Sequence, residues 1–323
     1  MIAGAAAIGR GMKRVAALLM TILGASCTSP RQAADNAAPT QQCEFGPGQS
    51  LGPSVNSPVF DGSPTVSSDE TELFFTSARE GQQDLFSSSR PSKDSAWTQP
   101  QNLGPAVNDP MSDDFSLRLS TDGTALYFAS IRRGGFGAAD MYVATRASRQ
   151  HPWGPATNLG PRVNTEAFEA FPTPSADGRT LYFNRSTTFD SQDSDIWVTS
   201  RAGREDSWGM PQRLASGINS ERAEFSPSLS TDGNTLYFGS DRGAALELWV
   251  TRRTNRTQDW STPETVRGGV NVPRSMTLAP FISADGRSLY FMSARPDAGD
   301  SGTCTPMTCF DRIDLYVARL QCR

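Results

Sequence analysis

The sequence predicts an all-β fold, a five-bladed β-propeller with four-stranded antiparallel blades. Three observations predict it: one pattern recurs five times, each copy contains a hairpin turn, and the piece that the last copy lacks stands at the N-terminus. The 323-residue chain is long enough for one large domain, and 28 glycines and 22 prolines suit many short strands joined by turns.

The repeat is clearest in a leucine followed by two aromatic residues, at intervals of 53, 55, 55 and 53 residues. A turn with an aspartate precedes each triplet, in four of five cases as Asp-Gly, and Gly favours hairpins because it adopts positive φ. A run that opens with an acid follows each triplet, so three strands are expected per unit. The triplets begin at Leu73, Leu126, Leu181, Leu236 and Leu289, and the acids are Asp84, Asp140, Asp195, Glu247 and Asp314.

A tryptophan opens the fourth strand of the first four units, at Trp97, Trp153, Trp208 and Trp260. The fifth unit has none, but Phe45 stands six residues before Leu51, as each Trp stands before its Leu or Val. We therefore expect the N-terminal strand to complete the last blade, which removes exposed sheet edges. The expected repeats span about 51–102, 103–158, 159–213, 214–265 and 266–323.

Residues 1–27 have the character of an export signal that ends in a lipobox-like sequence. Lys13 and Arg14 precede the apolar stretch 15–23, which is too short to span a bilayer. Cys27 follows, and we expect it to be lipidated; ordinary cleavage near Ala25 with release is the alternative. The polar residues 28–43 are expected to form a flexible tether, and residues 44–323 the propeller.

The motif 225–238, Phe-Ser-Pro-Ser-Leu-Ser-Thr-Asp-Gly-Asn-Thr-Leu-Tyr-Phe, is followed by Ser240-Asp241-Arg242. It resembles the WD40-like propeller repeats of the TolB type, and the resemblance covers about residues 45–323. The resemblance implies a propeller that serves as a partner-binding module of the bacterial envelope. Five repeats depart from the six blades of the TolB propeller.

Four cysteines remain beside Cys27, and an exported chain can oxidise them. The repeat register places Cys43 and Cys322 at one end of the last blade, which predicts a Cys43–Cys322 disulfide and leaves Cys304–Cys309. A metal site at the latter pair would need two more soft ligands, and the single His is far away in the chain, so we expect no metal.

A column of acids falls at the entry to the first strand of four units: Asp61, Asp114, Glu169 and Glu224, with Thr277 in the fifth. The first strand of a propeller blade lines the channel, so these acids would ring one mouth and bind a cation, a basic peptide or a sugar. The alternative is that they cap turns or pair with an Arg of the neighbouring blade. Recurrence favours this structural role, also for the arginine column Arg79, Arg132, Arg185, Arg242 and Arg295.

Composition and motifs argue against several functions. The net charge of −4 is opposite to the basic surface that nucleic-acid binding requires, and no nucleophile motif, phosphate loop or cofactor fingerprint occurs. We therefore expect no catalytic residue and no cofactor.

The connections between the second and third strands vary in length, and variable loops on a rigid scaffold are typical of recognition. The candidates are 132–139, 186–194 and 296–312. The sequence favours a monomeric periplasmic or outer-membrane lipoprotein that binds a protein or peptide of the cell envelope and touches the membrane through its lipid alone. A lectin or glycosidase using the acids is the alternative.

Overall fold

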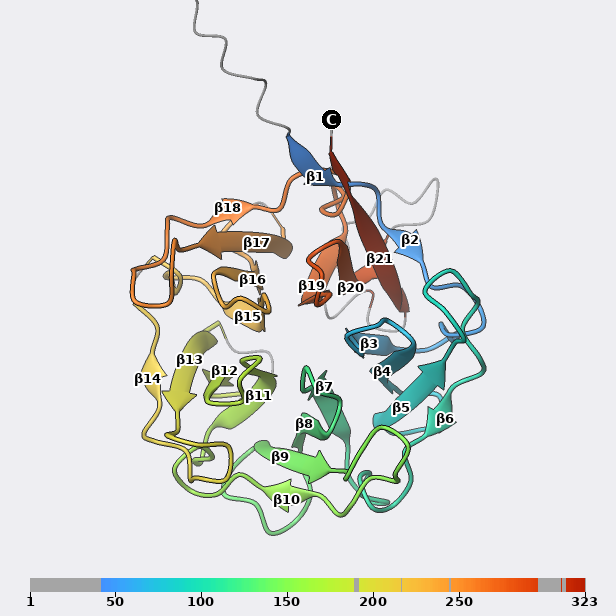
Figure 1. The fold of residues 1–323 in the computed structure, drawn as a ribbon. Coiled ribbons are helices and arrows are strands. Elements are labelled where there is room, and N and C mark those ends of the chain that lie inside the picture. The colour runs from blue at the N-terminus through green and yellow to red at the C-terminus, as the bar shows by residue number, and fades with distance from the viewer. Residues whose placement is uncertain are drawn as a thin grey trace, which may run out of the picture. The chain divides into compact units, whose positions relative to one another are not determined.

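The computed structural model describes residues 42–188, 192–215, 217–243, 245–295, 309 and 312–322. These residues form five antiparallel sheets around a common axis (Figure 1). The innermost strands β3, β7, β11, β15 and β19 each contact the innermost strands of both neighbouring sheets, so the ring is closed. The predicted five-bladed propeller is confirmed.

Each of the first four blades uses four consecutive strands, from the axis outward. The first blade has β3 (Asp61–Val66), β4 (Glu72–Ser77), β5 (Asp84–Ser89) and β6 (Gln101–Asn102). The second has β7 (Asp114–Leu119), β8 (Ala125–Ser130), β9 (Asp140–Thr145) and β10 (Thr157–Asn158). The third has β11 (Phe168–Pro174), β12 (Thr180–Ser186), β13 (Asp195–Ser200) and β14 (Gln212–Arg213). The fourth has β15 (Glu224–Leu229), β16 (Thr235–Ser240), β17 (Glu247–Arg252) and β18 (Glu264–Thr265).

The fifth blade combines the two ends of the chain. It contains β19 (Met276–Ile282), β20 (Ser288–Ala294) and β21 (Ile313–Cys322), and its outer edge is formed by β1 (Cys43–Phe45) and β2 (Gln49–Ser50), which both pair with β21. The predicted closure by the N-terminal strand is confirmed, and Figure 1 shows β1 beside the C-terminal end of β21.

Two further contacts hold this closure. Cys43 lies opposite Cys322 in the β1–β21 ladder, and the predicted disulfide joins them across a sequence separation of 279. The Asn56 side chain donates to Leu315 O at 3.1 Å and accepts from Leu315 N at 3.0 Å. In the other blades an asparagine side chain makes the same pair of hydrogen bonds to the backbone of the third strand. These asparagines are Asn108, Asn164, Asn219 and Asn271.

The outermost strands are shorter than the sequence suggested. We expected them to begin at the tryptophans, but β6, β10, β14 and β18 contain two residues each and begin later. Proline has no N–H to donate to a ladder, and one stands directly before these strands or two residues before. These prolines are Pro100, Pro155, Pro211 and Pro263.

Every innermost strand carries a β-bulge. The register with the second strand shifts in all five, and the first residue inside each shift has positive φ, between 47° and 55°. A bulge takes backbone groups out of the ladder, so carbonyls near the axis are free to accept other donors. The positive-φ residues are Ser63, Ser116, Phe171, Ser226 and Ala279.

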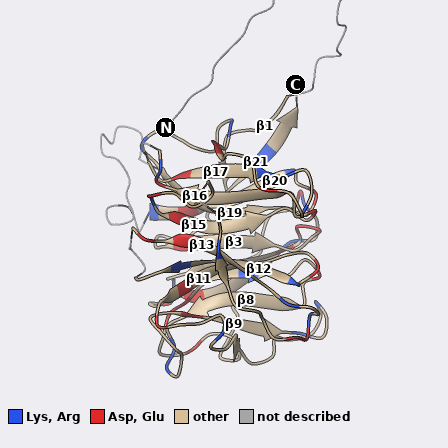
Figure 2. Cartoon of the chain, turned by 90° about the vertical axis from the view of Figure 1, so that its left-hand side faces the viewer, with Lys and Arg blue, Asp and Glu red and all other residues tan. Residues whose placement is uncertain are grey.

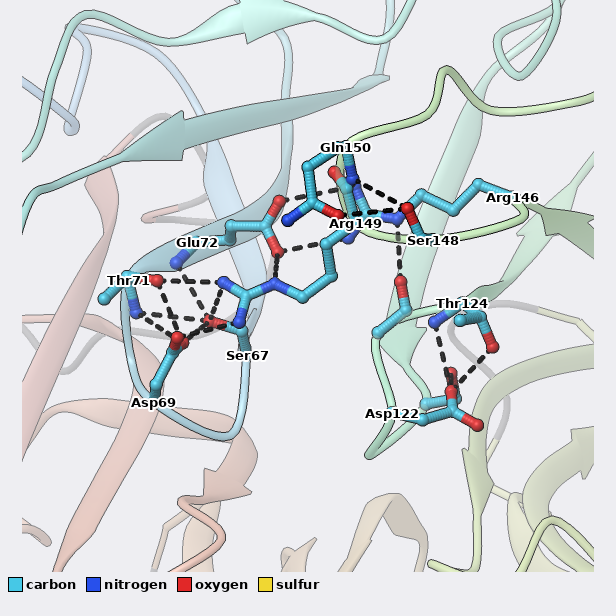
Figure 3. Close-up of polar contacts among 12 residues, drawn as sticks. Ser67, Asp69, Thr71, Glu72, Asp122, Thr124, Arg146, Ser148, Arg149 and Gln150 are labelled. Carbon is cyan, nitrogen blue, oxygen red and sulfur yellow. Dashed lines mark hydrogen bonds and ion pairs between the residues drawn. The ribbon is translucent and has the colours of Figure 1, made fainter.

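Ion pairs link neighbouring blades on the side of the ring where the hairpin turns between first and second strands lie. The aspartate of one hairpin turn accepts from a cation between the third and fourth strands of the next blade, and Figure 3 shows Arg149 reaching Asp69, Thr71 and Glu72. Analogous pairs join Asp122–Arg204, Asp177–Arg256 and Asp285–Lys93. The aspartate of the fourth blade, Asp232, has no such cation among the described residues.

No helix among the described residues has the length and apolar character needed to cross a bilayer.

Candidate functional site

The four acids predicted as binding candidates are completely buried, each with 0% exposure. Each carboxylate is paired with an arginine at 2.5–2.8 Å: Asp61–Arg79, Asp114–Arg132, Glu169–Arg185 and Glu224–Arg242. The second carboxylate oxygen accepts a backbone N–H from the preceding connection, at Ser57, Asp109, Thr165 and Ser220. In this conformation none of the four presents a carboxylate to a ligand at the channel mouth.

The pairing partner differs from the prediction. The sequence favours acids that cap turns or pair with an arginine of the neighbouring blade, but each arginine belongs to the same blade as its acid. Arg79, Arg132 and Arg242 follow the second strand, whereas Arg185 lies within it, opposite Glu169. The hairpin register explains this, because Asp61 lies opposite Ser77 and Arg79 follows two residues later. The arginine also donates to a carbonyl of the preceding connection, as Arg79 does to Val55 O at 2.6 Å. The acid and its arginine therefore clamp the connection between two blades.

The fifth blade breaks this pattern. Thr277 replaces the acid, and Arg295 has two buried nitrogens, Nε and Nη2, without an acceptor among the described residues. Burial lowers the pKa of Arg295. Nearby, burial and then the Asp61 charge raise the pKa of Asp314 to about 6.

The connections between second and third strands and those between consecutive blades emerge on one side of the ring, which we call the loop face. Figure 2 shows the blades from the side, with many charged residues near the strand ends. Three of the four exposed large apolar side chains in the described residues lie on this face: Met111 at 82%, Ile131 at 47% and Phe136 at 46%. We call these three residues the apolar cluster of the second blade.

The backbone brings the segments of Met111 and Ile131 together. Met111 lies in the connection that enters the second blade, and Ile131 directly follows β8. Ile131 N donates to Asp113 O at 3.2 Å, so the two connections run side by side. Met111 N in turn donates to the Asp109 carboxylate at 2.9 Å, which fixes its turn.

Asp140 shapes the loop that carries Phe136. Its carboxylate accepts from Phe136 N at 2.8 Å and from Gly137 N at 3.1 Å, and it is 1% exposed. A Cβ at Gly137 would lie 2.2 Å from Thr165 O, so only glycine allows this loop to pack on the next connection. Phe136 is therefore held outward by a fixed backbone instead of a mobile one.

The predicted recognition loops are described in part. Residues 132–139 contain Phe136 of the cluster, whereas 189–191 and nearly all of 296–312 lie outside the described residues. Cys304 also lies outside them; Cys309 is disulfide-bonded. The variable loop lengths predict the loop around Phe136 but not Met111, although an apolar residue in the polar stretch 108–114 is a signal for it.

A metal site and the single His are two further possibilities in the part of the chain that the structure describes. No group of three or more His, Cys, Asp or Glu side chains there is arranged to hold a metal ion. His151 is exposed in a turn, where its Nδ1 lies 2.9 Å from Ser148 Oγ.

Comparison with known proteins shows the fold alone. No family model and no curated protein sequence matches the chain. Among solved structures, the α-L-arabinofuranosidase of Podospora anserina in complex with cellotriose matches at 11% identity with a TM-score of 0.57, over 87% of this chain and 97% of that one. An α-L-arabinofuranosidase of Lactobacillus brevis matches at 14% and 0.53, over 82% and 92%. A putative TolB of Agrobacterium tumefaciens matches at 16% identity with a TM-score of 0.48, over 83% of this chain and 91% of that one.

Proposed function

We propose that this protein is a non-catalytic scaffold of the bacterial cell envelope that binds a protein or peptide through its loop face. The observation that carries the proposal is the apolar cluster of the second blade, because exposed apolar side chains on a rigid framework are typical of interaction sites. The buried acids give the same face no free carboxylate at the four predicted positions, which argues against cation binding there.

The rigidity of the cluster adds to this argument. Phe136 stands on a loop whose amides are fixed by the buried Asp140, and Ile131 directly follows a sheet strand. A partner that packs on such side chains loses little of its binding energy to ordering the loop. Aromatic and Met residues are also enriched in interface cores.

We further propose that export and a lipid on Cys27 place this scaffold at a membrane surface. The export-like segment 1–27 and the Cys43–Cys322 disulfide support an oxidising compartment. Cys27→Ala is expected to abolish labelling by a fatty-acid precursor and to move the protein to the soluble fraction. Unchanged membrane partition would contradict the lipid anchor.

The binding proposal is tested by substituting the cluster on the tagged full-length protein. Partners recovered from an envelope extract are quantified for the wild type, for Met111→Ser with Phe136→Ser, and for Met210→Ser. Met210 is the matched control, because it is equally apolar and 75% exposed but lies at the outer edge of the third blade.

The double variant is expected to weaken the affinity of a purified partner about tenfold or more, since hot-spot truncations cost about 2 kcal/mol or more. All variants should fold, because exposed substitutions change stability by about 0.5 kcal/mol or less. Equal loss in the Met210 control, or no loss in the double variant, would contradict the proposal.

A carbohydrate-active protein is the second candidate, and Asp314 is the observation that favours it. A carboxyl with a pKa near 6 beside another acid is the arrangement that a glycosidase uses for its general acid. Asp61 is buried and paired with Arg79, which speaks against it as the second catalytic carboxylate. Turnover of an aryl arabinofuranoside that disappears in Asp314→Asn would support this candidate, and no turnover by the wild type would count against it.

A further inference from the structure

One arginine lies inside the central channel. Arg118 on β7 occupies the inward position that the other blades fill with Thr65, Thr173, Ser228 or Phe281. Its side chain reaches across the ring: Nη2 donates to Pro280 O at 3.0 Å and to Pro227 O at 3.3 Å. The guanidinium also stands over the Phe281 ring, 5.0 Å from its centre. Arg118 thus connects the second blade with the fourth and the fifth.

The bulges of the innermost strands make this contact possible. The register shifts between Phe225 and Ser228, and again between Leu278 and Phe281. The prolines that lie inside these shifts have carbonyls that the ladder does not use. A single nitrogen of Arg118, Nη2, donates to both carbonyls.

The rest of the guanidinium has no partner. Nε and Nη1 are buried, and neither has an acceptor among the described residues. Within the described part of the chain no carboxylate pairs with Arg118, unlike the arginines that clamp the connections. The residue is 6% exposed, and burial lowers the pKa of Arg118 to about 9, so it is still charged at neutral pH. A buried charge without a counter-charge is costly.

A small cavity lies against this charge. Its volume is about 40 Å³, and its lining includes Arg118, Thr173, Ser228, Ser230, Thr231 and Phe281. The volume is that of a few water molecules or one small ion. The hydroxyls of Thr173, Ser230 and Thr231 already donate to protein oxygens. Ser228 Oγ accepts from Ile282 N at 3.2 Å, which leaves its proton for a hydrogen bond to an anion.

We propose that this cavity binds a small monovalent anionic group, either a halide ion or the carboxylate of a short acid or peptide end, with Arg118 as its counter-charge. The cavity opens among the hairpin turns, on the side of the ring opposite the loop face, so this site is independent of the proposed partner site. Four of the five turn aspartates on that side are neutralised by cations of the next blade. Asp232 is the fifth of these turn aspartates. Its carboxylate accepts a hydrogen bond from Ser230 Oγ, and its negative charge opposes the binding of an anion.

The direct test uses crystals of the exported protein grown with sodium bromide. An anomalous peak within hydrogen-bonding distance of the Arg118 guanidinium is expected. If the cavity beside Arg118 holds only water in crystals whose channel side chains are ordered, the site does not bind a halide. The same crystals in sodium formate decide the carboxylate arm, because planar density against Arg118 supports it, and a water-filled site in both salts overturns the proposal.

Thermal melting gives a second measurement. At constant ionic strength, bromide or formate is expected to raise the melting temperature of the wild type and to leave that of Arg118→Met unchanged. Arg253→Met is the matched control, since Arg253 also stacks on an aromatic ring but lies at the outer edge over Trp260. The control should keep the salt response of the wild type. An equal response in Arg118→Met would overturn the proposal, and the crystal test decides if that variant fails to fold.

Discussion

Glu70 provides a sharp test of how the ring is closed, because two effects of its substitution oppose each other. It occupies the turn position that is glycine in the other four blades, and its φ of 55° is unfavourable for a side chain. Glycine there would relieve about 1 kcal/mol. The carboxylate, however, is 2% exposed and binds the fifth blade: Tyr290 Oη donates at 2.5 Å, Arg319 Nη1 at 2.9 Å and Ser288 Oγ at 3.0 Å.

Removing the carboxylate leaves the Tyr290 and Ser288 hydroxyls buried without this partner. An unsatisfied buried group costs about 1–3 kcal/mol, and hydrogen bonds to a charge contribute about 1.5–3 kcal/mol each. The loss therefore exceeds the relief of strain, and Glu70→Gly is expected to lower the free energy of unfolding by about 3 kcal/mol. Glu70→Gln keeps the shape but loses the charge, and about 1–2 kcal/mol is expected.

Equilibrium urea unfolding at pH 7 measures these differences. Glu264→Gln is the control, because Glu264 forms surface ion pairs with Arg252 and Arg267 that contribute about 0.5 kcal/mol or less. The expected order of stability is wild type and control, then Glu70→Gln, then Glu70→Gly. If Glu70→Gly equals or exceeds the wild type, backbone strain dominates and the network does not hold the first and fifth blades together.

Three further predictions concern stability in urea. Asp314→Asn should leave the free energy of unfolding unchanged at pH 4 and raise it by about 1 kcal/mol at pH 8. The pKa of Asp314 is raised to about 6 in the folded state, so folding opposes its ionisation. The wild type therefore loses stability as the pH rises from about 4 through 6, and the Asn variant does not. No pH dependence of this difference would refute it. Replacing both Cys43 and Cys322 by Ser should cost up to about 5 kcal/mol, the chain-entropy value for so long a loop, and an unchanged midpoint would contradict the closure. Arg149→Ala should cost about 2 kcal/mol, because Arg149 binds four side chains, those of Ser67, Asp69, Thr71 and Glu72. Arg256→Ala removes one exposed ion pair and should cost about 0.5 kcal/mol; equal costs would refute the distinction.

The sequence predicts the fold well because the propeller is a repeat, and register follows from spacing. The position of Phe45 relative to Leu51 placed the N-terminal strand in the last blade, and the same register paired Cys43 with Cys322. The lengths of the outermost strands were wrong, because the prolines before them were not weighed as ladder breakers.

Contacts between side chains were harder to predict. The recurrence of acids at the Asp61 position does not say where their side chains point. The pairing of Asp61 with Arg79 depends on the hairpin register and on burial. Departures from the repeat carried more information than its regular columns. Glu70 in place of glycine, Arg118 among small inward residues and Thr277 in place of an acid are visible in the sequence, but their partners come from other blades or from the breaks in the ladder.

The central claim is that a partner binds the loop face at the second blade, and hydrogen exchange of the complex tests it most directly. With a partner recovered by the wild type, amides of 109–113 and 131–138 are expected to exchange more slowly in the complex than in the free protein. The outer segment 204–213, which carries Met210, should exchange at the same rate in both. Protection confined to 204–213 or to the hairpin turns, with 109–113 and 131–138 unchanged, would contradict the claim.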